Sequence, residues 1–86
     1  MNKVLRYPIE ITDRQILRTA PGPIVHIGID QSHTPCIWIL ATIDSQPTDV
    51  ERVIFMCRTG DPIPARARKR IGSLIMQTVW HVFEIE

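Results

Sequence analysis

The sequence predicts a mainly β protein, a small antiparallel meander folded as a sandwich or partly open barrel. Apolar and polar residues alternate with a period of two along most of the chain, which is typical of half-buried strands. Turn-forming residues separate these runs at short intervals, as they do in small sandwiches and barrels. The 86 residues are 44% apolar and 22% charged, which is enough for one hydrophobic core. We therefore expect a single domain over residues 1–86.

Four strands are expected in the N-terminal half. Residues 3–11 alternate apolar and polar side chains, and Pro8 within them indicates an edge strand or a bulge. Residues 15–19 are predicted to form a short second strand. Residues 24–30 alternate again, after a breaker that contains two prolines and a glycine. Residues 36–43 (CIWILATI) are apolar at both parities, which predicts a central strand covered on both sides.

The next segments contain the one stretch without strand character. Residues 51–59 are predicted to be a strand that ends at a Gly-Asp-Pro turn. Residues 62–70 are basic and contain two prolines. They predict an extended surface loop or a short helical turn, so that we expect at most one short helix, near residues 63–70.

The C-terminal end is again rich in β-branched and aromatic residues. It predicts either one bent strand or two strands, over residues 71–77 and 78–85. A helix over residues 66–80 is the weaker alternative, because glycine, serine, threonine and valine within it are mediocre helix formers.

Composition excludes several classes of protein. The formal net charge is +1, so the chain as a whole has no strong attraction for nucleic acid or membranes, and we expect no direct nucleic-acid binding. No run of about 20 apolar residues is present to span a bilayer, and residues 1–6 lack the apolar core of a signal peptide. Cys36 and Cys57 are too few for a disulfide scaffold, so we expect free thiols in a cytoplasmic protein.

The apolar strands also predict a partner subunit. Residues 36–43 and 53–57 carry apolar side chains on both faces, and a chain of 86 residues provides little material to cover them. An assembly that buries one sheet face or a strand edge provides this cover. We therefore expect a homo-oligomer.

The most distinctive local feature is the basic sequence ARARKR at residues 65–70. Four cations lie within its last five positions. An arginine fork can hold a phosphate through two hydrogen bonds and can stack on a purine ring, whereas the alternative is a solvated charged loop without a ligand. The candidate phosphate-binding residues are Arg58, Arg66, Arg68 and Arg70.

Two tryptophans and one histidine complete the candidate ligand-binding residues. Strand parity places Trp38 on the same face as Cys36 and Leu40. It places Trp80 on the face opposite to His81. A tryptophan at a cavity mouth or a subunit interface could stack on a base, although core packing is the more common role. For His81 the corresponding structural role is that of a buried, hydrogen-bonded histidine.

The sequence contains no recognisable catalytic pattern. It has no P-loop, no Gly-rich dinucleotide turn, no paired-carboxylate motif and no Ser-His-Asp order. Cys36 and Cys57 could face each other on adjacent strands, but two thiols without further ligands make a weak zinc site. We therefore expect no enzymatic activity, no metal ion and no cofactor.

Four segments, in order along the chain, resemble a family of small proteins from tailed phages and prophages. They are residues 3–13 (KVLRYPIEITD), 34–38 (TPCIW), 59–63 (TGDPI) and 81–84 (HVFE). The sequence departs from the family pattern at residues 65–70, where it is more basic, and at Thr78, where the relatives are glycine-rich.

The resemblance implies a phage accessory protein that counters host immunity. The first mechanism that it implies is sequestration, in which oligomer pockets bind a nucleotide-type immune signal, with arginine on the phosphates and an aromatic side chain on the base. The alternative is a direct protein inhibitor of a host defence effector, similar to an anti-CRISPR protein. A structural or regulatory interaction module is the third function considered.

Overall fold

A computed structural model describes residues 2–42, 48–67 and 69–85. Within these residues the protein contains strands and connecting segments but no helix, which confirms the predicted mainly β class. None of the described residues belongs to a helix long and apolar enough to cross a membrane. The strands are β1 (Asn2–Pro8), β2 (Arg14–Thr19), β3 (Ile24–Ile29), β4 (Pro35–Thr42), β5 (Val50–Arg58), β6 (Lys69–Ile75) and β7 (Val79–Ile85).

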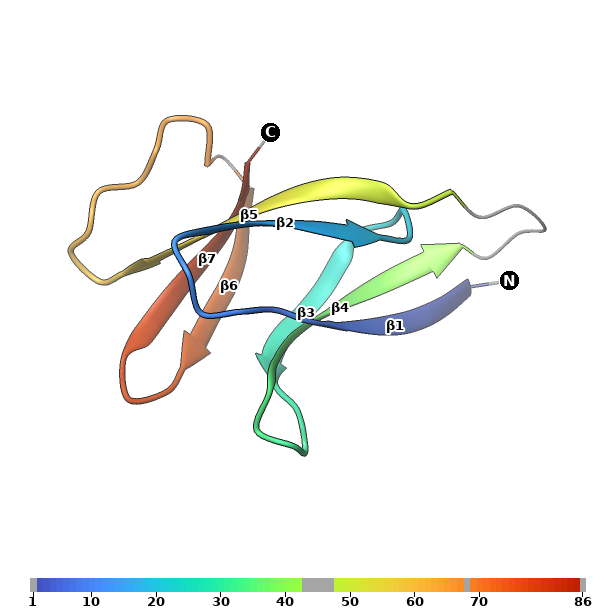
Figure 1. The fold of residues 1–86 in the computed structure, drawn as a ribbon, viewed down its shortest axis with the longest axis horizontal. Helices are drawn as coiled ribbons and strands as arrows, with labels where there is room; N and C mark the ends of the chain where they lie inside the picture. Colours follow the sequence, from blue (N-terminus) through green and yellow to red (C-terminus); the bar gives the residue numbers. More distant parts are fainter. Residues whose placement is uncertain (1, 43–47, 68, 86) are drawn as a thin grey trace.

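The strands form two antiparallel sheets that pack as an open sandwich (Figure 1). The three-stranded sheet has the order β1-β4-β3, and the four-stranded sheet has the order β2-β5-β7-β6. Of the seven strands in the described residues, only β3–β4 and β6–β7 pair with their neighbours in sequence, so most of the ladders join strands distant along the chain. β4 and β5 lie inside their sheets, in agreement with the apolar patterns at both parities.

Strand alternation gives each sheet one inner and one outer face. Ile37, Ile39, Ile54 and Met56 lie on the inner faces of β4 and β5 and are fully buried. They pack in one core cluster with Leu74 and other side chains from both sheets. Each large aliphatic side chain that is fully buried contributes about 1.5–3 kcal/mol, so this central layer holds the two sheets together.

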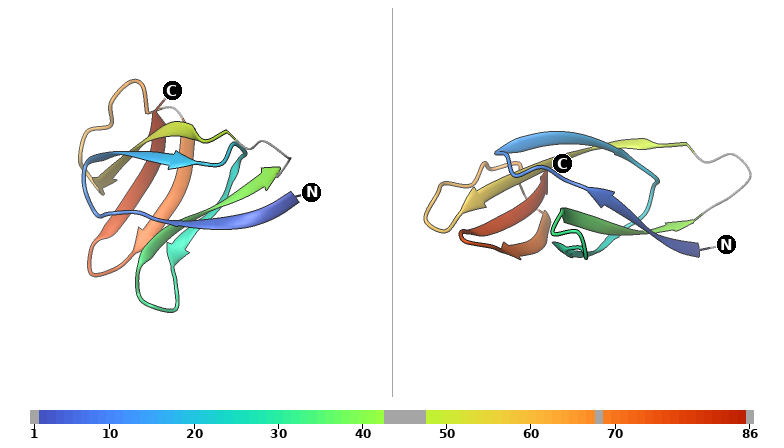
Figure 2. Two further views of the ribbon diagram at one scale, coloured as in Figure 1. Left: turned by 45° about the vertical axis from the view of Figure 1, so that its right-hand side comes forward. Right: turned by 60° about the horizontal axis from the view of Figure 1, so that its bottom comes forward.

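The sheets adjoin on one side, where β3 contacts β6. A Cβ atom at Gly72 would lie 2.7 Å from Ile27 Cγ2, so glycine permits this close approach between the strands. On the other side β1 and β2 belong to different sheets, and they diverge from their connection in the right-hand view of Figure 2. The sandwich is therefore open between the edges of β1 and β2.

The structure corrects the expectation for the basic segment. Lys69 and Arg70 were expected in a loop or a short helical turn, but they begin β6 and pair with Glu84 and Phe83 of β7. The helix considered over residues 66–80 is wrong for the same reason, because pairing with β7 overrides the weak local preference. The two-strand alternative for the C-terminal end is confirmed by β6 and β7.

Candidate functional site

The outer face of the four-stranded sheet carries Arg70 and His81, two of the candidate residues that the sequence singled out. The register places Ser73 of β6 beside His81 of β7, and His81 beside Cys57 of β5. In the next row Arg70 lies beside Phe83, which lies beside Phe55. This face therefore carries a polar row next to an aromatic row.

His81 is held by two hydroxyl groups. Its Nε2 atom lies 2.8 Å from Thr59 Oγ1, and its Nδ1 atom lies 3.2 Å from Ser73 Oγ. Arg70 Nη2 donates to the same Ser73 hydroxyl over 3.5 Å. We refer to Thr59, Arg70, Ser73 and His81 as the His81 cluster.

The His81 cluster has the chemistry of an anion-binding surface. A neutral imidazole donates through one nitrogen and accepts through the other, so one of the two hydroxyls must donate to it while the other accepts. Arg70 adds several N–H donors at an exposed position. Among the described residues no hydrogen bond joins a carboxylate to His81, and the acid–base orientation of a catalytic triad is therefore missing there.

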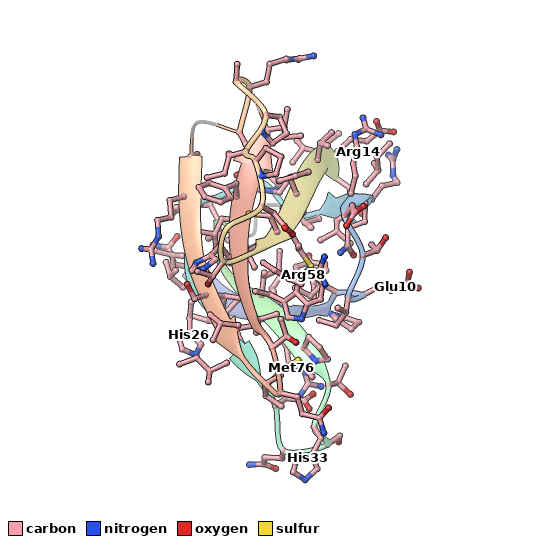
Figure 3. The ribbon with its side chains drawn as sticks, turned by 90° about the vertical axis from the view of Figure 1, so that its left-hand side faces the viewer. Glu10, Arg14, His26, His33, Arg58 and Met76 are labelled. Atoms are coloured by element: carbon pink, nitrogen blue, oxygen red, sulfur yellow. The ribbon has the colours of Figure 1, made fainter. Side chains whose placement is uncertain are left out.

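Arg58 lies at the end of β5 next to the His81 cluster. Its backbone N–H and its Nε atom both donate to Asp61 Oδ2, at 3.1 and 3.3 Å. A hollow of about 400 Å³ lies beside this contact and is lined by Arg58, Thr59, Asp61, Thr78 and Val79. Figure 3 shows Arg58 between Arg14 above and Met76 below. Arg58 therefore adjoins Thr59 of the His81 cluster.

The two predicted tryptophans lie away from this site. Trp80 faces inward and packs against the core, which confirms its parity opposite to His81 and gives it a structural role. Arg66 is exposed in the segment between β5 and β6, and Arg68 lies outside the described residues. Trp38 lies on the outer face of the other sheet, so one ligand cannot contact Trp38 and the His81 cluster of the same chain.

Trp38 is the centre of a row that crosses the three-stranded sheet. Arg6 lies opposite it on β1 and His26 on β3, with the His26 and Trp38 rings 4.9 Å apart and inclined by 54°. In Figure 3 His26 lies at the left margin of the molecule, apart from Arg58. Arg6 Nη1 forms an ion pair with Asp30 at 3.2 Å. This row is a second, separate polar and aromatic surface.

Asp30 organises the loop between β3 and β4. Its Oδ1 atom accepts the backbone N–H groups of Ser32 and Thr34 at 2.8 and 2.9 Å. These backbone donors, led by Thr34, lower the pKa of the Asp30 carboxyl, and Arg6 adds to the effect. The carboxylate is therefore used to hold the loop and Arg6.

The two cysteines lie in different sheets, so the expectation that they face each other on adjacent strands is wrong. Cys36 is on β4 and Cys57 is on β5, and both are free and buried. Among the described residues no group of three or more metal-ligating side chains is assembled. Burial raises the pKa of both thiols; Asp30 adds to this for Cys36, and Asp61 does so for Cys57.

We expect the buried thiols to make the fold sensitive to alkali. Because the thiol pKa values are higher in the folded state, this contribution to stability is present below about pH 8.5 and is lost as the pH rises through the folded values. Urea unfolding at neutral and alkaline pH measures the loss. A variant with Cys36→Ala and Cys57→Ala should lose less stability over the same interval, and an equal loss would contradict the assignment.

Both native thiols should also react with iodoacetamide about tenfold or more slowly in the folded protein than in urea.

Sequence reasoning missed a buried arginine on the inner face of β5. The Arg52 side chain is 9% exposed, and its Nε atom donates to Thr19 Oγ1 over 3.0 Å. Its two terminal nitrogens donate to Glu84, at 3.3 and 3.5 Å, and to the Gly22 carbonyl. Lys69 Nζ lies 4.0 Å from Glu84. Strand alternation could have predicted its burial, because Arg52 lies on the same face of β5 as the buried Ile54 and Met56.

A family model described as "Domain of unknown function (DUF7352)" matches the chain over residues 1–86. No curated protein and no solved structure matches the chain. The description of the matching family names no ligand and no activity.

Proposed function

We propose that this chain, which belongs to the family of the domain of unknown function DUF7352, is a non-enzymatic binding protein for a small nucleotide-type anion. The binding surface is the outer face of the four-stranded sheet around His81. The observation that carries the proposal is the juxtaposition of hydrogen-bond donors and aromatic side chains in neighbouring rows of that face.

The phosphate part of the ligand is assigned to the His81 cluster. Arg70 supplies a charged fork, and the hydroxyls of Thr59 and Ser73 and the imidazole of His81 add further hydrogen-bonding groups beside it. Hydrogen bonds to a charged acceptor are stronger than neutral ones. Hydroxyl, imidazole and guanidinium groups within one cluster therefore favour a phosphate over a neutral ligand.

The base is assigned to the aromatic row. Phe83 lies directly across from Arg70 on the paired strand and next to Phe55, and both phenylalanines are half-buried and partly open to solvent. A base that stacks on an aromatic side chain gains about 1–3 kcal/mol. Phe83 thus takes the stacking role that the sequence had suggested for a tryptophan.

The biological role that fits this binding is sequestration of a nucleotide immune signal. The resemblance to phage proteins supports that role, and binding without chemistry suffices for it. An oligomer, which stays a prediction, could bring the Trp38 surface of one copy near the His81 cluster of another. A direct inhibitor of a host effector requires a protein interface instead of a nucleotide site.

Calorimetry and NMR titration test the nucleotide proposal. Titrating the isotope-labelled protein with 5′-AMP, cyclic AMP and cyclic di-AMP should move the amide signals of β6 and β7 for at least one nucleotide. Arg70→Gln and Phe83→Leu should each weaken that binding by about tenfold, corresponding to the loss of one charged hydrogen bond or one stacking contact. Ribose 5-phosphate should bind more weakly than 5′-AMP.

Lys3→Gln is the matched control, because Lys3 is an exposed cation on the other sheet. It should leave nucleotide binding unchanged. If no nucleotide of the panel shifts β6 or β7, the proposal is wrong. A host protein that co-purifies with the chain in that case would favour the inhibitor function.

A further inference from the structure

β2 is a free edge of the four-stranded sheet. Among residues 2–42, 48–67 and 69–85 it pairs with β5 on one side only, and the sandwich formed by these residues is open on its other side. The Gln15 side chain occupies the start of this edge, because its amide bonds both the N–H and the C=O of Glu10, at 3.0 and 2.7 Å. Beyond Gln15, no backbone hydrogen bond within the described part of the chain joins residues 16–18 to a segment other than β5. An edge of this kind is a template for another strand.

The side chains along the edge follow a regular charge pattern. Arg14, Ile16 and Arg18 occupy alternate positions and therefore share the outer face. All three are exposed or partly so, with Ile16 55% exposed and the Arg18 side chain 65% exposed. β2 contains no acidic residue. The edge thus presents a cation, an apolar side chain and a second cation at the spacing of a β-strand.

A hollow beside the same edge offers apolar surface. It has a volume of about 480 Å³ and is lined by Ile16 and Leu17 of β2, by Pro8 at the end of β1 and by Ile9 after it, together with polar side chains. A strand added to β2 could place side chains of one parity toward this hollow and those of the other parity on the outer face.

The positive charges of β2 favour an acidic strand at this edge over a second copy of β2. A second copy of β2, paired antiparallel about Ile16, would place Arg14 opposite Arg18 twice, and like charges directly opposite each other are destabilising. A strand with carboxylates at the same spacing would instead face both arginines with opposite charge. Arg18 already bonds Glu51 on β5 at 3.2 Å, so this position accepts a carboxylate neighbour in the structure.

We propose that β2 binds an extended acidic polypeptide segment by strand addition, with carboxylates at positions i and i+4 and an apolar residue at i+2. The segment pairs with the backbone of residues 16–18, and its carboxylates lie against Arg14 and Arg18. This interaction uses neither the His81 cluster nor Phe83, and it meets the proposed nucleotide surface only where Arg14 lies beside Phe55.

A pair of peptides tests the proposal. Acetyl-Thr-Glu-Thr-Val-Thr-Glu-Thr-amide should shift the amide signals of β2 in an NMR titration and should bind about tenfold more tightly than the same peptide with lysine in place of glutamate. Added salt should reduce the difference, since the charges are exposed. N-methylation of alternate peptide bonds on the pairing side should abolish binding of the acidic peptide.

The charge-reversed variant Arg14→Glu/Arg18→Glu makes the test specific. It should prefer the lysine peptide, while Lys3→Glu, the same type of change on β1, should leave the original preference intact. Equal binding of both peptides would overturn the proposal, as would the absence of any shift in β2. Retained binding after N-methylation would show a purely electrostatic contact and would likewise overturn strand addition.

Discussion

Replacing Arg52 by alanine is expected to lower the free energy of unfolding by about 3–5 kcal/mol, the range for breaking a buried ion pair by removing one partner. Arg52 joins Thr19 at the end of β2, the Gly22 carbonyl in the turn to β3, and Glu84 on β7. Removal leaves Glu84, whose side chain is 17% exposed, with only the distant Lys69 as partner among the described residues. Thr19 is fully buried and loses a donor at the same time.

A matched control separates this buried pair from ordinary surface charge. The ion pair between Arg18 and Glu51 has a similar separation of 3.2 Å, but both side chains are more than 60% exposed. Arg18→Ala should therefore change the unfolding free energy by less than about 1 kcal/mol. Urea titration followed by circular dichroism compares the two variants. Equal losses would contradict a structural role for the Arg52 contacts.

Arg52→Lys keeps the comparison informative if Arg52→Ala does not fold. A lysine retains the positive charge near Glu84 but has one ammonium group in place of the three-nitrogen fork. It cannot reach Thr19, Gly22 and Glu84 together, so its stability should fall between those of the native chain and the alanine variant. Stability equal to that of the native chain would show that charge alone matters.

Local alternation was sufficient to predict most of the strands and the direction of several side chains. The opposite faces of Trp80 and His81, and the shared face of Trp38 and Cys36, follow from strand parity. The start of β6 could not be predicted in this way. Lys69 and Arg70 belong to a basic run that resembles a loop, and only pairing with β7 makes them part of a strand.

The candidate site depended on strand order, which local sequence does not determine. Ser73 and His81 could be expected to meet only if residues 71–85 formed a hairpin, and Thr59 joins them only because β5 pairs with β7. The same order places Trp38 on the other sheet. The burial of Arg52 was not predicted either, because its partners Thr19, Gly22 and Glu84 are brought to it by the packing of distant segments.

The second large loss of stability is expected for Gly22→Ala. Gly22 lies in the turn whose carbonyl accepts a hydrogen bond from Arg52. Gly22 has φ of +141°, which side-chain-bearing residues rarely adopt, and an added Cβ would lie far inside van der Waals contact with the Leu40 carbonyl oxygen. The obstructing atoms belong to the β4 backbone, which cannot move aside by changing a rotamer. We expect a loss of more than about 2 kcal/mol, because backbone strain and displacement of the turn add together.

Gly60→Ala provides the internal comparison for this substitution. Gly60 also has a positive φ, +94°, but a Cβ atom added there would have no heavy atom within 4 Å, so the variant reports backbone strain of about 1 kcal/mol without a clash. The excess loss in Gly22→Ala measures the contact with β4.

Displacing Gly22 also moves the carbonyl that accepts a hydrogen bond from Arg52. Gly22→Ala and Arg52→Ala should therefore lose less together than the sum of their separate losses. Additive losses in the double variant would show that the turn and the buried arginine act independently.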